Sequence, residues 1–292
     1  MRALFLCIAL FILSALPALA TDVLILQSSQ SPAYMEALRG FRSAFTGSSN
    51  TIVIADYAEV DAVRLVKEER PRLVLAVGDT ALAACRKVRQ VPVVSLMSLS
   101  LTLAKVTNPN IGGVGVVAAP ERYLSLFKAI GAGRVGVLYD PRRSGAYLKR
   151  AQQAARRLGI DLVTREVRNP KETVGRLEQL KGSVDALWML PDTTAVTLEN
   201  LDAYFRFSLE QQVPLITFAS QYLGKGAFAA LEADRLDQGS VVVEQIRRVL
   251  GRDGEPWVAD PRKLRLSTNA SVASKLGIPI SGLERIVRDT EE

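Results

Sequence analysis

Two stretches of the chain decide its fold: VLAVGDT at residues 74–80 and LWMLPDT at residues 187–193. They lie 113 positions apart, within an ungapped correspondence between residues 23–80 and residues 136–193. Each stretch is an apolar run that ends in Asp-Thr, which is typical of a buried parallel strand followed by a helix. The repeat predicts two similar lobes in one chain, with a ligand held between them.

Apolar runs alternate with amphipathic segments along the rest of the chain, at the spacing of βαβ units. After a slip of nine positions the internal correspondence resumes, with VPVVSLMS at 91–98 opposite VPLITFAS at 213–220. The runs are almost entirely apolar, which indicates parallel strands covered by helices on both faces. The predicted fold class is therefore α/β, with two doubly wound parallel-sheet lobes.

Interruptions of this alternation indicate where the chain passes between the lobes. NPNIGG at 108–113 breaks the pattern before a predicted strand at 114–117, and GKG at 224–226 begins a return through a strand and a long helix. A third crossing, at about 258–259 after the long helix, brings the number to three and predicts a three-stranded hinge. The expected parts are a signal peptide at 1–20, lobe 1 at 21–118 plus about 225–258, and lobe 2 at 119–224 plus about 259–292.

The first twenty residues are typical of a secretory signal peptide. Arg2 gives a positive start, residues 3–16 are apolar, and ALA at 18–20 is a small-x-small cleavage signal. A buried N-terminal strand or an uncleaved anchor is the alternative. No later segment reaches the ~20 apolar residues of a membrane span, so we expect an exported, periplasmic protein.

Composition excludes several chemistries. The 292 residues include no histidine, so the chain cannot build a Ser-His-Asp or Cys-His catalytic set or a histidine metal site. Cys7 would leave with the signal peptide, so Cys85 would remain alone, and we expect it to be a buried apolar residue. No P-loop or dinucleotide-binding glycine pattern follows the first strand. We expect no enzyme activity, no cofactor and no metal.

The formal net charge is +7, but the arginines are spread along amphipathic helices rather than gathered in one block. Nucleic-acid binding requires a clustered basic footprint, so we expect no nucleic-acid partner. Solvated helix faces explain these charges better, and attraction to an anionic membrane surface or an acidic partner is the alternative.

Polar and aromatic residues at strand ends are the candidate site. In open parallel sheets ligands bind beyond the carboxyl ends of the strands, where the N–H groups of helix N-termini converge. The candidate ligand-binding residues are Ser28, Ser29, Asp79, Thr80, Ser95, Tyr139, Asp192, Thr193, Ser220, Gln221 and Tyr222. For each polar residue the alternative is a helix cap or turn, and for each ring it is packing between the lobes. Tyr34 and Tyr147 also lie near strand mouths, whereas Trp188 is expected in the core.

Several motifs, in their order and spacing, resemble one known family. They are GVLYDP at 136–141, LPDTTAV at 190–196, VPLITFAS at 213–220, KGAFAAL at 225–231 and LSTNASVASKLGIPI at 266–280. The chain is similar to the periplasmic substrate-binding proteins of ABC importers with the type I fold. The most similar branch includes members that bind tryptophan and other aromatic amino acids.

Two departures from that family fall at the expected ligand cleft. The family's Thr-Asp-Pro turn after the fourth strand is replaced by SLSLT at 98–102, and its Asp-Asn-Thr reads Asp192-Thr193-Thr194. For an amino-acid-like ligand, Ser28, Ser29 and Thr80 would receive the carboxylate. Asp192 would pair with the ammonium group, and Tyr139 or Tyr222 would cover the side chain.

The resemblance implies an exported solute-binding component of an ABC importer, a monomer that closes its lobes on a small solute. The solute would be amino-acid-like, with aromatic amino acids among the candidates, and the partner would be an ABC permease in the inner membrane. The alternative is a ligand-sensing or partner-binding envelope protein of the same fold that signals to a membrane kinase or receptor. An exported hydrolase is a third hypothesis, which the absence of histidine disfavours.

Overall fold

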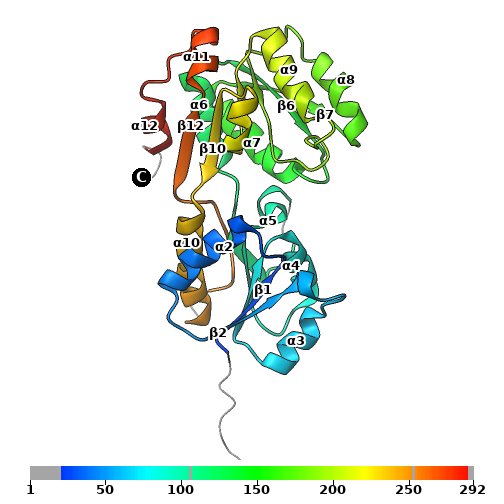
Figure 1. The fold of residues 1–292 in the computed structure, drawn as a ribbon, viewed down its shortest axis with the longest axis vertical. Coiled ribbons are helices and arrows are strands. Elements are labelled where there is room, and N and C mark those ends of the chain that lie inside the picture. The colour runs from blue at the N-terminus through cyan, green and yellow to red at the C-terminus, as the bar shows by residue number, and fades with distance from the viewer. Residues whose placement is uncertain (1–20, 105–106, 252–253, 289–292) are drawn as a thin grey trace, which may run out of the picture.

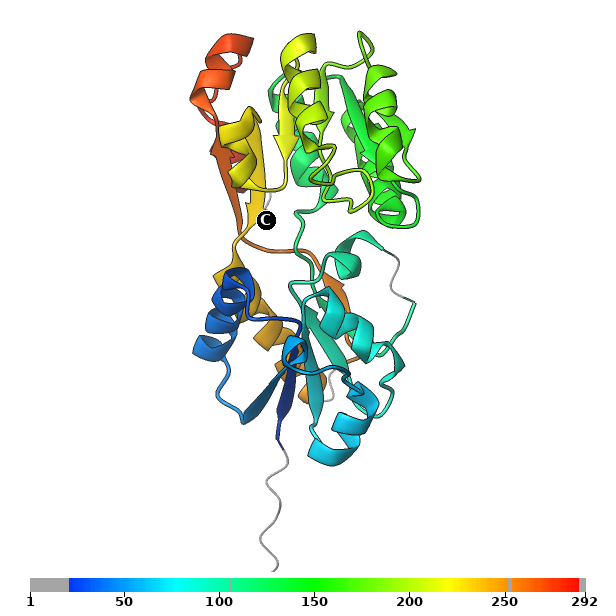
Figure 2. The same cartoon turned by 45° about the vertical axis from the view of Figure 1, so that its right-hand side comes forward.

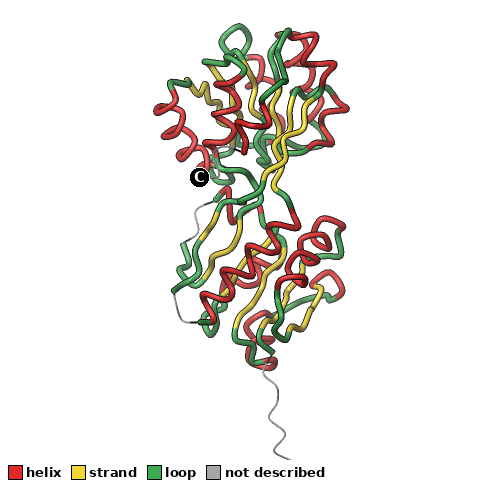
Figure 3. Tube along the Cα trace, turned by 90° about the vertical axis from the view of Figure 1, so that its left-hand side faces the viewer, coloured by secondary structure: helices red, strands yellow, loops and turns green. Residues whose placement is uncertain are grey.

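Two α/β lobes are joined by a narrow waist and stacked along the long axis of the molecule (Figure 1). The structure is a computed structural model that describes residues 21–104, 107–251 and 254–288. The predicted signal peptide at residues 1–20 lies outside the described residues. Each lobe contains a six-stranded sheet, with helices on both faces of the sheets (Figure 3).

Lobe 1 contains a fully parallel sheet of order β11-β5-β4-β3-β1-β2. Its strands are β1 (Val23–Gln27), β2 (Ser49–Val53), β3 (Leu73–Val77), β4 (Val93–Leu96), β5 (Ile111–Val114) and β11 (Val258–Ala259). Its helices are α2 (Pro32–Ala44), α3 (Ala62–Glu69), α4 (Asp79–Ala84), α5 (Leu99–Leu103) and α10 (Arg235–Leu250), with short 3₁₀ turns η1 (Ile54–Asp56) and η2 (Cys85–Lys87). Every residue of β1 and β3 is buried, as their apolar sequences predict.

Lobe 2 repeats this arrangement with the order β12-β10-β9-β8-β6-β7. Its strands are β6 (Arg134–Tyr139), β7 (Asp161–Glu166), β8 (Ala186–Trp188), β9 (Leu215–Thr217), β10 (Ala229–Ala233) and β12 (Leu264–Thr268). Its helices are α6 (Pro120–Ala129), α7 (Gly145–Leu158), α8 (Thr173–Glu178), α9 (Leu201–Gln211), α11 (Ala270–Leu276) and α12 (Leu283–Arg288), with 3₁₀ segments η3 (Pro170–Glu172) and η4 (Ser220–Lys225).

The two sheets match strand for strand, and this confirms the predicted fold class. β1 and β3 in lobe 1 occupy the places of β6 and β8 in lobe 2, as the 113-residue offset requires. The last strand differs, because β11 runs parallel to β5 whereas β12 runs antiparallel to β10.

Three segments cross the waist between the lobes, after β5, after β10 and after β11 (Figure 2). The middle crossing comes later than the sequence indicated. Residues 225–233 were expected in lobe 1, but β10 pairs with β9 and β12 and therefore belongs to lobe 2. A short apolar strand fits either sheet, so the sequence alone could not tell which one would pair with it.

The first crossing also differs from the expectation. The glycines at 112 and 113 were read as a break before a strand at 114–117, yet they lie within β5. A Cβ atom on Gly113 would come 2.1 Å from the Ser95 carbonyl oxygen, and its φ of +146° also favours glycine. These glycines therefore let β5 lie close to its neighbours, and they do not end the sheet.

Helices α2 and α10 cover one face of the lobe 1 sheet and cross in close contact. A Cβ on Gly40 would lie 2.1 Å from the Leu236 carbonyl oxygen, and a Cβ on Gly239 would lie 2.0 Å from the Ala37 carbonyl oxygen. The two glycines thus allow backbone-to-backbone packing. This contact fixes the start of α10, which forms one wall of the space between the lobes.

Candidate functional site

A cavity of about 420 Å³ opens between the lobes at the waist. It is the candidate site because both lobes and the crossing segments line it. Lobe 1 contributes Tyr34, Asp79, Met97, Leu99 and, at the start of α10, Arg235 and Gln238. Lobe 2 contributes residues 218–221 and, at the end of β10, Glu232 and Ala233, and the first crossing contributes Val116. A larger cavity of about 760 Å³ lies on the outer side of lobe 2, away from the crossings. We call the 420 Å³ space the cleft cavity.

Tyr34 forms part of the lobe 1 wall. It lies in the first turn of α2, where the Ser31 hydroxyl caps the helix by accepting a 3.3 Å hydrogen bond from the Tyr34 N–H. Its phenol oxygen lies 2.5 Å from where a Cβ on Gly78 would be, and the φ of +88° at Gly78 favours glycine at this strand end. Burial, together with the charge of Asp79, raises the pKa of the Tyr34 phenol.

Asp79 follows β3 and caps the neighbouring helix α5. Its carboxylate accepts hydrogen bonds from the Ser98 hydroxyl at 2.6 Å, the Ser100 N–H at 2.9 Å and the Leu99 N–H at 3.1 Å. Partial burial favours the neutral acid, but the hydrogen bonds outweigh it and lower the pKa of Asp79. Asp79 is therefore an anion at the cavity wall whose oxygens already have partners.

Met97 connects β4 to α5 and has a left-handed backbone with φ of 60°. Residues other than glycine rarely adopt this conformation, which costs energy and often marks functional sites. The other two such residues in the described chain, Arg70 and Gln212, end helices α3 and α9. Met97 has no such role, and the conformation places its backbone at the cavity wall.

Opposite charges lie side by side at the hinge. The Arg235 guanidinium donates a 3.1 Å hydrogen bond to the Glu36 carboxylate and lies 4.0 Å from the Glu232 carboxylate. The Gln238 amide, almost completely buried, donates a 2.6 Å hydrogen bond to the Gly115 carbonyl and ties α10 to the first crossing. The hinge thus presents a cation and an anion to the same cavity.

Lobe 2 contributes the end of β9 and the start of η4. Ser220 and Gln221 are exposed on η4, and Phe218 is half-buried. Behind them the ring of Tyr222 lies edge-on to Phe218, with centroids 5.5 Å apart, and 6.1 Å from the ring of Phe205. Tyr222 therefore supports the cavity wall from within lobe 2.

Of the residues selected from the sequence, Asp79, Ser220 and Gln221 line the cleft cavity. Thr80 and Thr193 are exposed at the ends of their strands, outside that lining. Ser28 is buried, and its hydroxyl accepts a 2.9 Å hydrogen bond from the Ala81 N–H in the first turn of α4. Ser29 is half-buried, and its carbonyl accepts a hydrogen bond from the Gln27 amide.

Asp192 is completely buried within lobe 2. Its carboxylate accepts hydrogen bonds from the N–H groups of Asp140, Thr194 and Ala195 and from the Ser144 hydroxyl. These four donors occupy both oxygens, so a solute entering the cleft in this conformation cannot contact Asp192. In this conformation Asp192 therefore has the position expected of the alternative, a local cap.

Ser95 and Tyr139 lie away from the cleft cavity. Ser95 is inside β4 on the face that packs against α4, and its buried hydroxyl has no partner among the described residues. The Tyr139 hydroxyl donates a 3.3 Å hydrogen bond to the Glu166 carboxylate, beside a separate groove next to α7. Sequence position at or near a strand end thus did not ensure exposure to the cleft.

Three further expectations concern buried residues. Trp188 is in the core of lobe 2, as expected. Cys85 is a fully buried free thiol, also as expected, and burial raises its pKa to about 12. Tyr147 was grouped with the strand mouths, but it is buried against Trp188 and donates a hydrogen bond to the Ala118 carbonyl.

Several cavity residues were not selected from the sequence. Met97 and Phe218 belong to strand connections, and Glu232, Arg235 and Gln238 flank the crossing between β10 and α10. Glu232 and Arg235 did carry a signal, because charges follow the apolar strand directly in ALEADR at 230–235. Charged residues at a predicted crossing between lobes are candidates for a cleft site.

Within the described residues, no group of three or more Cys, Asp or Glu side chains is arranged to hold a metal ion. In the same part of the chain, no helix combines the length and apolar character needed to cross a bilayer.

The chain resembles known proteins in both sequence profile and fold. The profile of the family described as ABC transporter substrate binding protein matches residues 53–291. Among solved structures, the ligand-free, open structure of a substrate-binding protein with adhesive properties from Clostridium difficile aligns with a TM-score of 0.66 and 17% identity, over 90% of this chain and 97% of that one. No curated protein matches the chain in sequence.

Two further structures share the fold. A conserved domain protein from Vibrio cholerae aligns with a TM-score of 0.61 and 19% identity, over 92% of this chain and 98% of that one. An ABC domain in complex with L-Trp from Streptococcus pneumonia aligns with a TM-score of 0.60 and 18% identity, over 92% and 97% of the two chains. At these identities the likeness concerns the fold.

Proposed function

The chain belongs to the family of ABC transporter substrate-binding proteins, and we propose that it captures a small amino-acid-like solute between its lobes for an ABC importer. The observation that carries the proposal is the cleft cavity, which both lobes and the hinge line together. A solute there contacts surfaces that approach one another only when the lobes close. Its binding therefore favours the closed state over the open one.

The charges at the hinge support a zwitterionic ligand. Arg235 offers guanidinium donors for a carboxylate, and Glu232 offers an acceptor for an ammonium group. The two groups lie 4.0 Å apart, which suits the adjacent charges of an α-amino acid. Lobe closure would exclude water and strengthen both contacts. Asp192 and Ser28 are buried within their lobes, so in the proposed site they are replaced by this pair, which lines the cavity although Arg235 also pairs with Glu36.

Aromatic rings favour a ligand with an apolar side chain. Tyr34 belongs to lobe 1 and Phe218 to lobe 2, so closure would bring a ring from each lobe toward the solute. A flat side chain gains both burial and ring contacts in such a place. We propose aromatic amino acids as the first ligands to test. Thr80 and Thr193, which are exposed outside the cavity lining here, would come close to the solute when the lobes close.

The remaining parts of the proposal concern location and partners. Export through a signal peptide at residues 1–20 would place the protein in the periplasm, where a closed, loaded monomer would meet an ABC permease in the inner membrane. The family and the two-lobed fold support this role.

A panel of free amino acids tests the proposal. The chain lacking residues 1–20 is mixed with each amino acid, and its melting temperature is measured. A ligand at ~100 times its dissociation constant stabilises the fold by about 2.7 kcal/mol. Since about 1 kcal/mol shifts the melting temperature of a domain of about 150–250 residues by about 2–4 °C, a rise of several degrees is expected. No shift with any amino acid, at concentrations up to the millimolar range, would contradict amino-acid capture.

A further inference from the structure

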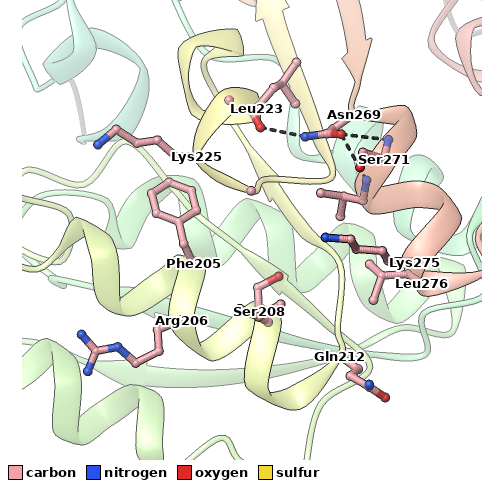
Figure 4. A pocket seen from close by; sticks show the side chains of 14 residues that line it. Phe205, Arg206, Ser208, Gln212, Leu223, Lys225, Asn269, Ser271, Lys275 and Leu276 are labelled. Atoms are coloured by element: carbon pink, nitrogen blue, oxygen red, sulfur yellow. Dashed lines mark hydrogen bonds between the residues drawn. The ribbon is translucent and has the colours of Figure 1, made fainter.

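A second cavity, of about 760 Å³, lies on the outer side of lobe 2 between α9, η4 and α11 (Figure 4). We call it the outer pocket. Its volume falls within the ~300–1,000 Å³ that is typical of small-molecule sites. It is separate from the cleft cavity, because no residue lines both. Only η4 contributes to each, with Ser220 and Gln221 on the cleft side and residues 223–225 on the outer side.

The body of the outer pocket is apolar. Five hydrophobic side chains from the three elements line it: Phe205, Leu209, Leu223, Val272 and Leu276. Leu209 is 73% exposed, on the side of α9 that faces away from the core. Covering this surface with an apolar group would remove it from water.

Two neutral polar groups of the pocket, the Asn269 amide and the Ser208 hydroxyl, already have partners within the fold. The Asn269 side chain donates to the Leu223 carbonyl at 2.8 Å and accepts from the N–H groups of Ser271 and Val272 (Figure 4). The Ser208 hydroxyl donates to the Val213 carbonyl at 2.7 Å. These groups maintain the shape of the pocket and are not free to bind a ligand.

The charged groups of the pocket all have one sign. Arg206, Lys225 and Lys275 line it, no carboxylate does, and none of the three has an ion pair within the described residues. In Figure 4 the Lys275 ammonium extends from α11 toward α9, whereas Lys225 and Arg206 lie on the other side of Phe205. If the anionic head group of a ligand lay beside Lys275, the apolar body of the same ligand would cover Phe205 and Leu209.

We propose that the outer pocket binds a small amphiphilic carboxylate, with the head group held by Lys275 and the apolar body laid between α9 and α11. The cleft cavity presents charges of both signs, whereas the outer pocket presents cations alone, so the two sites select different ligands. The occupant would also contact η4, the segment whose first residues line the cleft.

Octanoate is a suitable probe, used below its micellar concentration with the chain lacking residues 1–20. Amide NMR spectra are followed during the titration, with octanol, octylammonium and acetate as comparison compounds. We expect saturable binding of one octanoate, with shifts confined to residues 223–226, α9 and α11. Octanol and octylammonium, which lack the negative head group, and acetate, which lacks the tail, should each bind at least about tenfold more weakly.

Variants separate the charge contribution from general apolar binding. Lys275→Gln should weaken octanoate binding about tenfold, which corresponds to about 1.4 kcal/mol. The double variant Arg206→Gln with Lys225→Gln, whose charges lie on the other side of Phe205, should weaken it less. Lys67→Gln, an exposed lysine on α3 of lobe 1, is the matched control and should leave the affinity unchanged. The proposal is overturned if octanoate does not bind at millimolar concentration, or if its shifts map to the cleft. Equal binding of octanol, or equal affinity in all variants, would overturn it as well.

Discussion

Asp79 and Asp192 occupy equivalent positions of the internal repeat, and each carboxylate accepts hydrogen bonds from its own lobe. Asp79 caps α5 by accepting hydrogen bonds from Ser98, Leu99 and Ser100. Asp192 accepts hydrogen bonds from the N–H groups of Thr194 and Ala195, in the loop that follows β8. In both lobes, therefore, a carboxylate just beyond a central strand holds a nearby strand connection in place through hydrogen bonds. Asp79 remains at the cleft wall, whereas Asp192 is completely buried.

Replacing Asp79 should loosen α5. Asp79→Ala removes the acceptor of three hydrogen bonds at the start of a five-residue helix. Loss of a helix cap typically costs about 0.5–2 kcal/mol, and we expect a loss at the upper end in the free energy of unfolding, measured in urea. Thr80→Ala, an exposed neighbour, is the control and should change the free energy by less than about 0.5 kcal/mol. Equal stability of the two variants would refute the capping role.

Asp192→Asn tests whether this residue is structural or contacts the ligand. An amide offers one acceptor oxygen and directs N–H groups at donors that now face a carboxylate, so we expect a loss of about 2–4 kcal/mol in the free energy of unfolding. Asp202→Asn, on the exposed side of α9, should have little effect. In the folded fraction, solute affinity should change less than about threefold, and a large loss of affinity at unchanged stability would instead support ammonium binding by Asp192.

Acidification should destabilise the fold through Asp140. Hydrogen bonds from the Arg142 side chain outweigh burial and lower the pKa of this carboxyl to about 2, from an ordinary 3.8. Because folding depresses the pKa, the stabilisation is complete above about pH 4 and is lost as the pH falls toward 2.

Arg142→Gln removes the main cause of that shift. In urea unfolding at pH 2 to 5, we expect this variant to lose less stability between pH 4 and pH 2 than the unmodified chain does. Arg143→Gln, the exposed neighbour, should retain the original pH dependence. Parallel pH profiles for all three proteins would show that Arg142 does not control Asp140.

The crossing of α2 and α10 should not tolerate a methyl group. A Cβ on Gly239 would lie 2.0 Å from a carbonyl oxygen of α2, so Gly239→Ala must push the helices apart, at a cost of about 2–3 kcal/mol. Gly175→Ala is the matched control, because Gly175 is also helical but faces open space. That change should stabilise the fold by about 0.5–1 kcal/mol. Thermal unfolding measures both, and a neutral Gly239→Ala would contradict the close packing.

Solute affinity should depend on a ring from each lobe. Tyr34→Ala and Phe218→Ala each remove an aromatic surface of the cleft cavity. Burial of one such side chain contributes about 1.5–3 kcal/mol, so each change should weaken binding of an aromatic amino acid by about tenfold or more in calorimetry. Tyr57→Ala, an exposed tyrosine beyond η1, is the control and should leave the affinity unchanged. If only one of the two cleft variants weakened binding, capture by a single lobe would explain the data better.

Much of the fold could be predicted from the sequence, because buried parallel strands appear there as apolar runs. The apolar run at 74–77 and the long helix expected after residues 224–226 correspond to β3 and α10. The strand expected after residues 224–226 was assigned to the wrong lobe, since its apolar residues say nothing about which sheet pairs with it. Helix α5 was not predicted, because its stability comes from Asp79, twenty residues earlier in the chain.

Less of the candidate site could be predicted from the sequence. Sequence gives the type of residue at a strand end but not the donors that fold against it. Ser28 and Asp192 carry suitable groups, yet nearby N–H groups use them. Conversely, Glu232 and Arg235 reach the cavity because the hinge passes through it, and that path depends on where β10 pairs.

A crystal structure of the chain with a bound amino acid from the thermal panel tests the central claim most directly. The account predicts one solute in the cleft cavity, in contact with Tyr34 and Phe218 at once, with its carboxylate at Arg235 and the lobes closer together than here. A solute bound to one lobe alone, or outside the cleft with the lobes unmoved, would contradict it.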